Sequence, residues 1–580
     1  MRRAGWGLVA LLLLAPSAAQ AITLFDLDDK PLTLNIDESF GVEWHNNHDF
    51  GVPNTLKDDY VKLENVLSAD FRWQEFTLGM RVEGNYYPDP LDFTVIVPRL
   101  DRIPLIRTQT ASENDFHFEK YYFIYDSPRL RVDVGDYYVT FGRGLALALQ
   151  READDSIDTT LTGGKARLSI EDTTATLLAG FTNTLNVDPN HETRQDDPRD
   201  LIWGARLEQR IADFMTVGGH AAYTEFGELE GEQKKRFIGE ADTTIAGGTI
   251  EFPDIGGHAS VYFEGDWIRR RGREVTEEIT DYRMVQDDGF GLYGSLAGYV
   301  ENATLTAEYK YYNDFIFRRG RTTLGYMLPE GEQPPDDLQF FEDIYYNNVP
   351  TLERTDIETN RTYGNDHGFR IRADYNSINT GTQPYVALYY TRNIWQEQGT
   401  SSLGGFGSDE DFEGDRIWHA YGGVTQMIGE IELLIDGGFR DEYSLDENQK
   451  LLQIGHAKTS GSFPLVAKHS LGYEFSFLHK NYVSKKEQEF DYDLTLNYSF
   501  TPYLSLSFLY TLQRKDYLPS SGEDETNHFF AGEAASTLFD GILRVSIFGG
   551  QVRESIRCYG GFCRKVPPFE GVKAKIRVAF

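Results

Sequence analysis

Long hydrophobic runs and cysteine are both scarce in this chain of 580 residues. After residue 21, no segment approaches the roughly 18 uninterrupted apolar residues that mark a transmembrane helix. Every backbone polar group must be paired inside lipid, so a closed β-barrel is the only other structure that could span a membrane. The two cysteines, Cys558 and Cys563, permit at most one disulfide.

Positive charge and catalytic motifs are scarce as well. The chain has 56 Lys and Arg against 91 Asp and Glu, a formal net charge of −35, which excludes nucleic acid as a partner because its backbone needs clustered cations. There is no Gly-x-Ser-x-Gly elbow, no P-loop and no C-x-x-C-H haem site. We therefore expect no enzyme activity and no cofactor, with a lipase or protease built on a barrel as the alternative.

The first 21 residues have the pattern of a secretory signal peptide. Arg2 and Arg3 form the charged start, an apolar stretch follows, and Ala19-Gln20-Ala21 is a small-x-small cleavage site. No cysteine follows the cleavage site, so we expect no lipid anchor. Residues 22–580 then form a single domain, because no Pro- or Ser-rich linker divides them.

Within the last nine residues, apolar and cationic side chains alternate from Val572 to Val578. Val572, Ile576 and Phe580 belong to the apolar set, while Lys573, Lys575 and Arg577 separate its members. Successive strand residues point to opposite faces, so this pattern predicts a strand with one lipid-facing and one polar face. The end of the chain resembles that of many bacterial outer-membrane barrels, whose terminal Phe is read by the barrel-assembly machinery; the resemblance implies the same role for Phe580.

Alternation recurs in runs of about ten residues, for example at 303–311 and 490–500, as expected for tilted membrane strands. Eleven tight connections, such as those near 73–76, 301–302 and 461–464, alternate with twelve longer polar ones. Short periplasmic turns and long external loops are typical of outer-membrane barrels. The sequence thus predicts an all-β transmembrane antiparallel barrel of about 24 strands (22–26), in the outer membrane with both termini periplasmic. The first of these strands is expected by about Pro31.

One connection contains a distinctive motif, Gly-Asp-Tyr-Tyr-Val-Thr-Phe-Gly-Arg-Gly-Leu at 135–145, followed by Ile157, Asp158 and Gly163. It resembles a motif of a family of uncharacterised bacterial outer-membrane barrels. The resemblance covers about 30 residues and implies location and fold, since that family has no established substrate. The matching positions are Gly135, Asp136, Tyr138, Phe141, Gly142, Gly144, Leu145, Ile157, Asp158 and Gly163.

The same connection is predicted to narrow the pore. A barrel of 24 strands is too wide for wall side chains to fill, and we expect no plug domain before the first strand. The apolar run Leu-Ala-Leu-Ala-Leu at 145–149 would be unfavourable in bulk water, so residues 136–158 should fold against the inner wall. Arg143 and Arg151 would then face acidic groups across a narrowed passage. The predicted constriction residues are Asp136, Phe141, Gly142, Arg143, Gly144, Arg151 and Asp158.

One short motif could form a disulfide, and two others could bind a metal ion. Cys558 and Cys563 lie in the last external loop, and in an oxidising compartment we expect them to form a disulfide. His45 and His48 have a spacing compatible with a metal, and the acidic run at 409–415 could hold a hard cation. Solvated loop residues are the simpler interpretation of both, so we predict no metal site.

The function expected from these features is porin-like, passive passage of small solutes through a polar lumen that inward-folded loops narrow. The alternative is a scaffold or sheath for a periplasmic or surface partner in secretion, motility or electron transfer. The expected partners are outer-membrane lipid, the barrel-assembly machinery and, in the alternative, a protein that fills the lumen.

Overall fold

The protein is described by a computed structural model. It covers residues 22–27, 30–46, 59–88, 91–97, 105–111, 115–149, 151–152, 157–182, 185–188, 193–196, 199–227, 239–275, 282–315, 318–319, 344–347, 350, 352, 365–377, 379–394, 416–443, 450–466, 468–483, 486–500, 503–517, 525–553, 555–559, 562–566 and 569–580.

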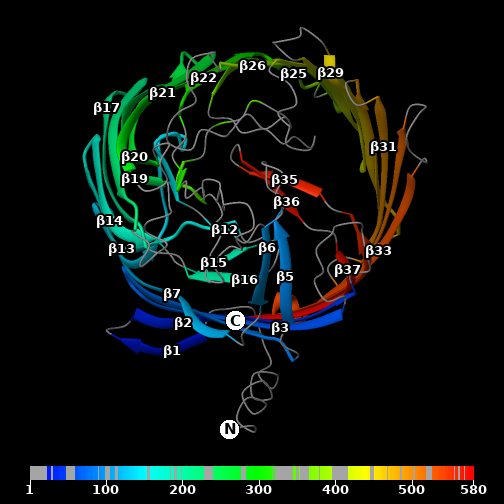
Figure 1. Cartoon of the computed structure of the whole chain (residues 1–580), viewed down its shortest axis with the longest axis horizontal. Helices are drawn as coiled ribbons and strands as arrows, with labels where there is room; N and C mark the ends of the chain where they lie inside the picture. Colours follow the sequence, from blue (N-terminus) through cyan, green and yellow to red (C-terminus); the bar gives the residue numbers. More distant parts are fainter. Residues whose placement is uncertain are drawn as a thin grey trace.

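The architecture is one closed antiparallel β-barrel (Figure 1). Its sheet contains 25 strands, of which 24 form the ring, because β1 (Ile22–Leu27) pairs only with the start of β2. The predicted count of about 24 strands is therefore confirmed. In chain order the ring strands are β2 (Lys30–Asn46), β3 (Asp59–Trp73), β4 (Phe76–Tyr86), β7 (Asp115–Asp126), β8 (Leu130–Tyr137), β13 (Leu161–Ile170), β14 (Thr173–Thr182), β17 (Leu201–Ala212), β18 (Met215–Glu225), β19 (Gly239–Ile255), β20 (Ala259–Val275), β21 (Tyr282–Val300), β22 (Ala303–Asn313), β25 (Asp366–Tyr375), β26 (Thr382–Asn393), β27 (Arg416–Ile428), β28 (Ile431–Tyr443), β29 (Lys450–Pro464), β30 (His469–Tyr482), β31 (Glu487–Phe500), β32 (Leu504–Tyr517), β33 (Glu525–Leu538), β34 (Leu543–Val552) and β37 (Phe569–Ala579).

Smaller hairpins lie in the connections between ring strands. They are β5 (Leu91–Val97) with β6 (Leu105–Ala111), β9 (Val139–Phe141) with β10 (Leu147–Leu149), β11 (Arg151–Glu152) with β12 (Ile157–Asp158), β15 (Leu185–Asp188) with β16 (Thr193–Asp196), β23 (Arg318–Arg319) with β24 (Ile344–Tyr345), and β35 (Ser555–Tyr559) with β36 (Phe562–Val566).

The ring closes where the first and last of its strands meet. β37 pairs with β34 on one side and with β2 on the other, so red and blue strands lie side by side in Figure 1. The backbones of Ile36 and Phe580 exchange two hydrogen bonds, of 3.1 and 2.8 Å. Arg577 forms an ion pair with Asp37 across the same seam. The terminal strand predicted from its alternation thus completes the barrel.

The two faces of the wall differ as a membrane barrel requires. On β22, Leu305 and Tyr309 are about half exposed on the outer face, while Lys310 is completely buried on the inner face. Phe263 of β20 is 58% exposed, whereas its neighbour Glu264 is 2% exposed. An apolar outer surface and a polar interior characterise transmembrane barrels. Within the described ranges, no helix has the length and apolar character needed to cross a bilayer.

Two strand boundaries differ from the expectation. β1 precedes the first expected strand and pairs with residues 30–34 of β2. The pairing of β2 with β37 begins only at Asp37, so this part of the edge of β2 is available to β1. The connection expected at 461–464 lies at 465–468 instead, because β29 continues to Pro464, which pairs with Ser470 of β30. Proline is tolerated there because it ends the strand, where a missing backbone N–H costs little.

Several predicted features lie outside the described part of the chain. These are residues 1–21, His48 and the acidic run at 409–415. His45 is described, and its Nε2 lies 3.0 Å from Glu43. The backbone of hairpin β35–β36 pairs Cys558 directly with Cys563, but both side chains lie outside the described part, so the disulfide stays a prediction.

Candidate functional site

The connection between β8 and β13 contains a short hairpin that lies inside the barrel. Val139–Phe141 pairs with Leu147–Leu149, and residues 142–146 form the turn, in which the N–H of Gly144 donates to the carbonyl of Phe141 at 2.9 Å. Gly142 and Gly144 have φ angles of 59° and 98°, which glycine adopts at low cost. We call residues 139–149 the luminal hairpin; in Figure 1 it lies within the ring beside β19 and β20, in cyan.

The apolar side chains of the luminal hairpin are almost completely removed from solvent. Phe141 and Leu147 are 0% exposed, and Leu149 is 1% exposed. They pack with inward-facing apolar residues of the wall, among them Ile202 of β17 and Ile268 of β20. Burial of this run explains why an apolar stretch can occur in a connection of a membrane barrel.

A hydrogen bond to a wall carboxylate fixes the turn of the hairpin. The backbone N–H of Arg143 donates to Oε2 of Glu264 at 2.8 Å, and the hydroxyl of Tyr262 donates to the same oxygen at 2.6 Å. Gly142 leaves just enough room for this carboxylate, since a Cβ at that position would lie 1.8 Å from Oε1 of Glu264. The turn is therefore fitted to the inner face of β20.

The side chain of Arg143 is exposed and extends along a row of polar wall groups. Its guanidinium lies 4.5 Å from the ring centre of Tyr262 and 6.0 Å from that of Tyr293. The hydroxyl of Tyr293 donates to Glu308 at 2.7 Å, and Glu308 forms a 2.5 Å ion pair with Arg370. A cation over two tyrosine rings at the hairpin tip places fixed positive charge next to the lumen.

A second connection holds the hairpin from the other side. The N–H of Ala148 donates to the carbonyl of Tyr346 at 2.7 Å, and the side-chain amide of Asn347 donates to the carbonyl of Leu145 at 3.0 Å. The hydroxyl of Tyr346 in turn donates to Asp200 at 2.6 Å. The hairpin is thus bonded to a wall strand and to the connection between β22 and β25.

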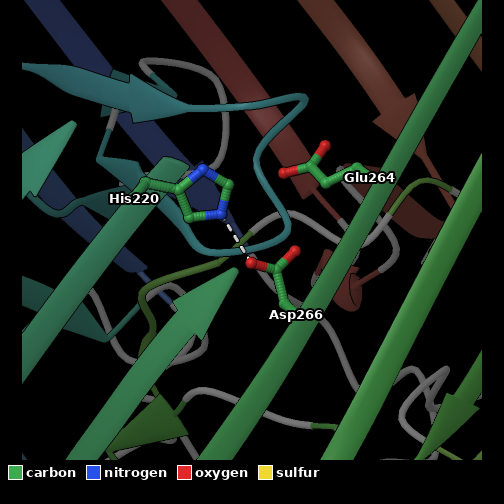
Figure 2. A group of neighbouring side chains, drawn as sticks. All are labelled: His220, Glu264 and Asp266. Atoms are coloured by element: carbon green, nitrogen blue, oxygen red, sulfur yellow. Dashed lines mark hydrogen bonds and ion pairs between the residues drawn. The ribbon is translucent and has the colours of Figure 1, made fainter. Parts of the chain in front are cut away.

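Beneath the hairpin, three buried ionisable side chains converge on one point (Figure 2). His220 comes from β18, and Glu264 and Asp266 come from β20; we call them the His220 cluster. The Nε2 atom of His220 lies 2.5 Å from Oδ1 of Asp266. The ring of Phe141 lies against that of His220, with 6.1 Å between their centres, so the hairpin covers the cluster.

A glycine lets Asp266 reach His220 across an intervening strand. In the barrel register, His220 lies opposite Gly247 of β19, and Gly247 lies opposite Asp266. A Cβ on Gly247 would lie 2.0 Å from Oδ1 of Asp266. The absence of a side chain at this position makes the contact between β18 and β20 possible.

The structure brings together some of the predicted constriction residues and separates others. Phe141, Gly142, Arg143 and Gly144 all belong to the luminal hairpin. Asp136 lies in β8 instead, where its carboxylate accepts hydrogen bonds from the N–H of Tyr121, at 2.7 Å, and from the hydroxyl of Thr162.

Asp136 therefore links the wall strands β7, β8 and β13. Arg151 and Asp158 pair as backbone neighbours in hairpin β11–β12, and their side chains lie outside the described part.

His220 is the residue that sequence reasoning missed. The alternation of β20 already indicates that Glu264 and Asp266 share the inner face, because they are two residues apart. His220 is 44 positions before Glu264 and belongs to no recognisable spacing. Only the register across β18, β19 and β20 brings it to the two carboxylates.

The fold and these contacts define a membrane-spanning barrel with a hairpin folded into its lumen. Residues 8–242 match the model of DUF6029, a family of unknown function. The luminal hairpin and His220 fall within the matched range, whereas Glu264 and Asp266 lie beyond it. None of the curated proteins matches the chain.

Several solved structures are similar to this chain over most of its length. The translocation pore of the P pilus usher PapC is 9% identical, with a TM-score of 0.43 and coverage of 94% of this chain and 99% of the usher chain. The copper transporter OprC is 9% identical, with a TM-score of 0.45 and coverage of 95% and 80%. A variant of the ferric enterobactin receptor of Pseudomonas aeruginosa is 9% identical, with a TM-score of 0.47 and coverage of 94% and 80%.

Proposed function

We propose that the protein is an outer-membrane channel through which small solutes pass passively, and that the luminal hairpin narrows its lumen. The observation that carries this proposal is the placement of the hairpin, whose apolar side chains are buried against β17–β20. Its turn presents Arg143, which is exposed. A barrel of this size leaves a passage that wall side chains alone do not fill, so a folded-in connection sets its width.

The charge of Arg143 should bias which ions enter. Its guanidinium is held over Tyr262 and Tyr293 without an ion pair to a carboxylate among the described residues. A cation at a narrow point attracts anions and repels cations. The protein acts in this proposal without catalysis, and outer-membrane lipid and the barrel-assembly machinery are its expected partners.

Conductance in planar bilayers tests the proposal. Replacing residues 139–149 with an equally long Gly-Ser segment should raise single-channel conductance while the barrel still shows heat-modifiable migration in gels. Arg143→Glu should shift selectivity toward cations. Lys575→Glu is the matched control, because it makes the same charge change on β37, whose partner strands in the wall are β2 and β34.

An assembled hairpin replacement with unchanged conductance would overturn the channel proposal. It would favour the scaffold alternative, in which a partner in secretion, motility or electron transfer fills the lumen. Equal selectivity shifts in Arg143→Glu and Lys575→Glu would contradict the role given to Arg143.

A further inference from the structure

We propose that His220, Glu264 and Asp266 form a binding site for one divalent transition-metal ion in the inner wall, beneath the luminal hairpin. The site stands independently of solute passage, since a metal could bind here in a channel or in a scaffold. It differs from the sequence-based expectation of no metal site, which considered only His45, His48 and the acidic run at 409–415.

The geometry supplies three ligand atoms at one point. One nitrogen of His220 and one oxygen from each of the two carboxylates all lie within 4.8 Å of one another. In Figure 2 the carboxyl groups of Glu264 and Asp266 point toward the same space as the imidazole. One imidazole and two carboxylates leave coordination positions open for water, as in metal sites with three protein ligands.

Unsatisfied polar atoms are the second observation. His220, Glu264 and Asp266 are only 6%, 2% and 1% exposed. Within the described part of the chain, Oε1 of Glu264 and Oδ2 of Asp266 have no hydrogen-bond partner. Buried polar atoms are rarely left without a partner, and a bound metal ion is one way to satisfy them.

The charge balance points to a cation. Neither Glu264 nor Asp266 forms an ion pair with a lysine or an arginine among the described residues, and His220 is the only basic side chain bonded to either. Burying a carboxylate without a compensating charge is costly. A divalent ion would neutralise both carboxylates at once.

The surroundings orient one ligand and exclude solvent. Oε2 of Glu264 is already held by the N–H of Arg143 and the hydroxyl of Tyr262, which leaves Oε1 free. Such partners fix the direction of a ligating carboxylate. Gly142 and Phe141 cover the cluster from the lumen.

The ligand set favours a transition metal over magnesium or calcium, which prefer oxygen ligands alone. Ligand bonds of roughly 2.1 Å separate neighbouring ligand atoms by roughly 3 to 3.5 Å. The 2.5 Å contact between His220 and Asp266 would therefore widen by roughly 0.5–1 Å on binding, which a small rotation of the Asp266 carboxyl group provides.

Metal titration of the intact protein tests the site. The detergent-solubilised, heat-modifiable barrel is treated with a chelator and titrated with Zn²⁺ or Mg²⁺ by calorimetry. We expect one equivalent of Zn²⁺ to bind and Mg²⁺ not to bind. Removing a residue that hydrogen-bonds to a metal ligand typically lowers metal affinity 10–100-fold, and removing the ligand itself should lower it more. We therefore expect His220→Ala and Asp266→Asn to weaken Zn²⁺ binding by roughly 100-fold or more. Tyr262→Phe should weaken it by roughly 10-fold.

His45→Ala is the matched control, because His45 also bonds a carboxylate, Glu43, but that carboxylate already pairs with Lys573. Its Zn²⁺ affinity should equal that of the native protein. Absence of stoichiometric Zn²⁺ binding, or native affinity in both ligand variants, would overturn the proposal. If His220→Ala fails to assemble, the test uses Asp266→Asn and the visible absorption of Co²⁺ bound to the native protein. A Co²⁺ spectrum that Asp266→Asn leaves unchanged would also refute the site.

Discussion

The backbone N–H of Arg143 donates a 2.8 Å hydrogen bond to Oε2 of Glu264, although 121 positions separate the two residues. The donor belongs to the turn of the luminal hairpin and the acceptor to the inner face of β20. This bond therefore couples the position of the hairpin to a single wall carboxylate. The same carboxylate contributes to the His220 cluster, so changes to the hairpin should also affect the cluster.

Substitution of Gly142 tests how closely the turn is fitted to the wall. In Gly142→Ala the new Cβ would lie 1.8 Å from Oε1 of Glu264, and the φ of 59° would cost about 1–2 kcal/mol for a residue with a side chain. We expect the hairpin to leave its seat, which would speed hydrogen exchange of residues 139–149 and raise conductance.

The control for this substitution is Gly164→Ala in β13. A Cβ there would meet no atom within 4 Å, and its φ is not in the left-handed region. This variant should behave as the native protein. Native exchange rates in Gly142→Ala would show that the turn tolerates a side chain and would contradict the close fit of the hairpin to β20.

The two cysteines should form a disulfide. Cys558 and Cys563 are direct partners in hairpin β35–β36, a placement in which the side chains of a two-stranded ladder can approach each other. Peptide mapping of unreduced protein by mass spectrometry should find them joined. The double serine variant should assemble nearly normally, because so short a loop constrains the unfolded chain only modestly. Ready labelling of two free thiols would contradict the pairing.

The terminal residue should matter for closing the ring. Deleting Phe580 removes both hydrogen bonds with Ile36 at the seam between β2 and β37. We expect slower insertion into liposomes, measured by the appearance of the heat-modifiable form. Phe580→Ala distinguishes the contribution of the aromatic ring from that of the backbone hydrogen bonds, because it removes the ring and keeps the bonds. If the deletion inserts at the native rate, neither the ring nor these bonds assist closure.

The barrel was predictable from sequence because its determinants are local. Strand alternation and the recurrence of tight and long connections require only the two-residue period of a strand and the chemistry of turns. The inward placement of the apolar run at 145–149 was also accessible, since exposure of such a run is unfavourable. β1 was missed because it pairs with a free edge, and the sequence does not show which edges stay free.

The His220 cluster was not predictable, because it depends on register between strands. A shift of one residue in a strand turns every side chain to the other face, and no pattern within β18 indicates its partner in β20. The contact between His220 and Asp266 crosses β19 at Gly247, and the role of this glycine is visible only when the three strands are aligned. The hydrogen bonds of Asp136, which the sequence predicts at the constriction, likewise join neighbouring wall strands that only the register identifies.

Gly247 consequently offers a specific test of the link between β18 and β20. In Gly247→Ala the added Cβ would lie 2.0 Å from Oδ1 of Asp266 and 2.3 Å from the carbonyl oxygen of Gly265, so the Asp266 carboxyl must move away from His220. We expect a lower unfolding temperature in detergent and weaker Zn²⁺ binding than in native protein. Gly455→Ala in β29 is the control, because a Cβ there would meet nothing within 4 Å. A Gly247→Ala barrel as stable as this control would show that the contact between His220 and Asp266 contributes nothing measurable to the wall.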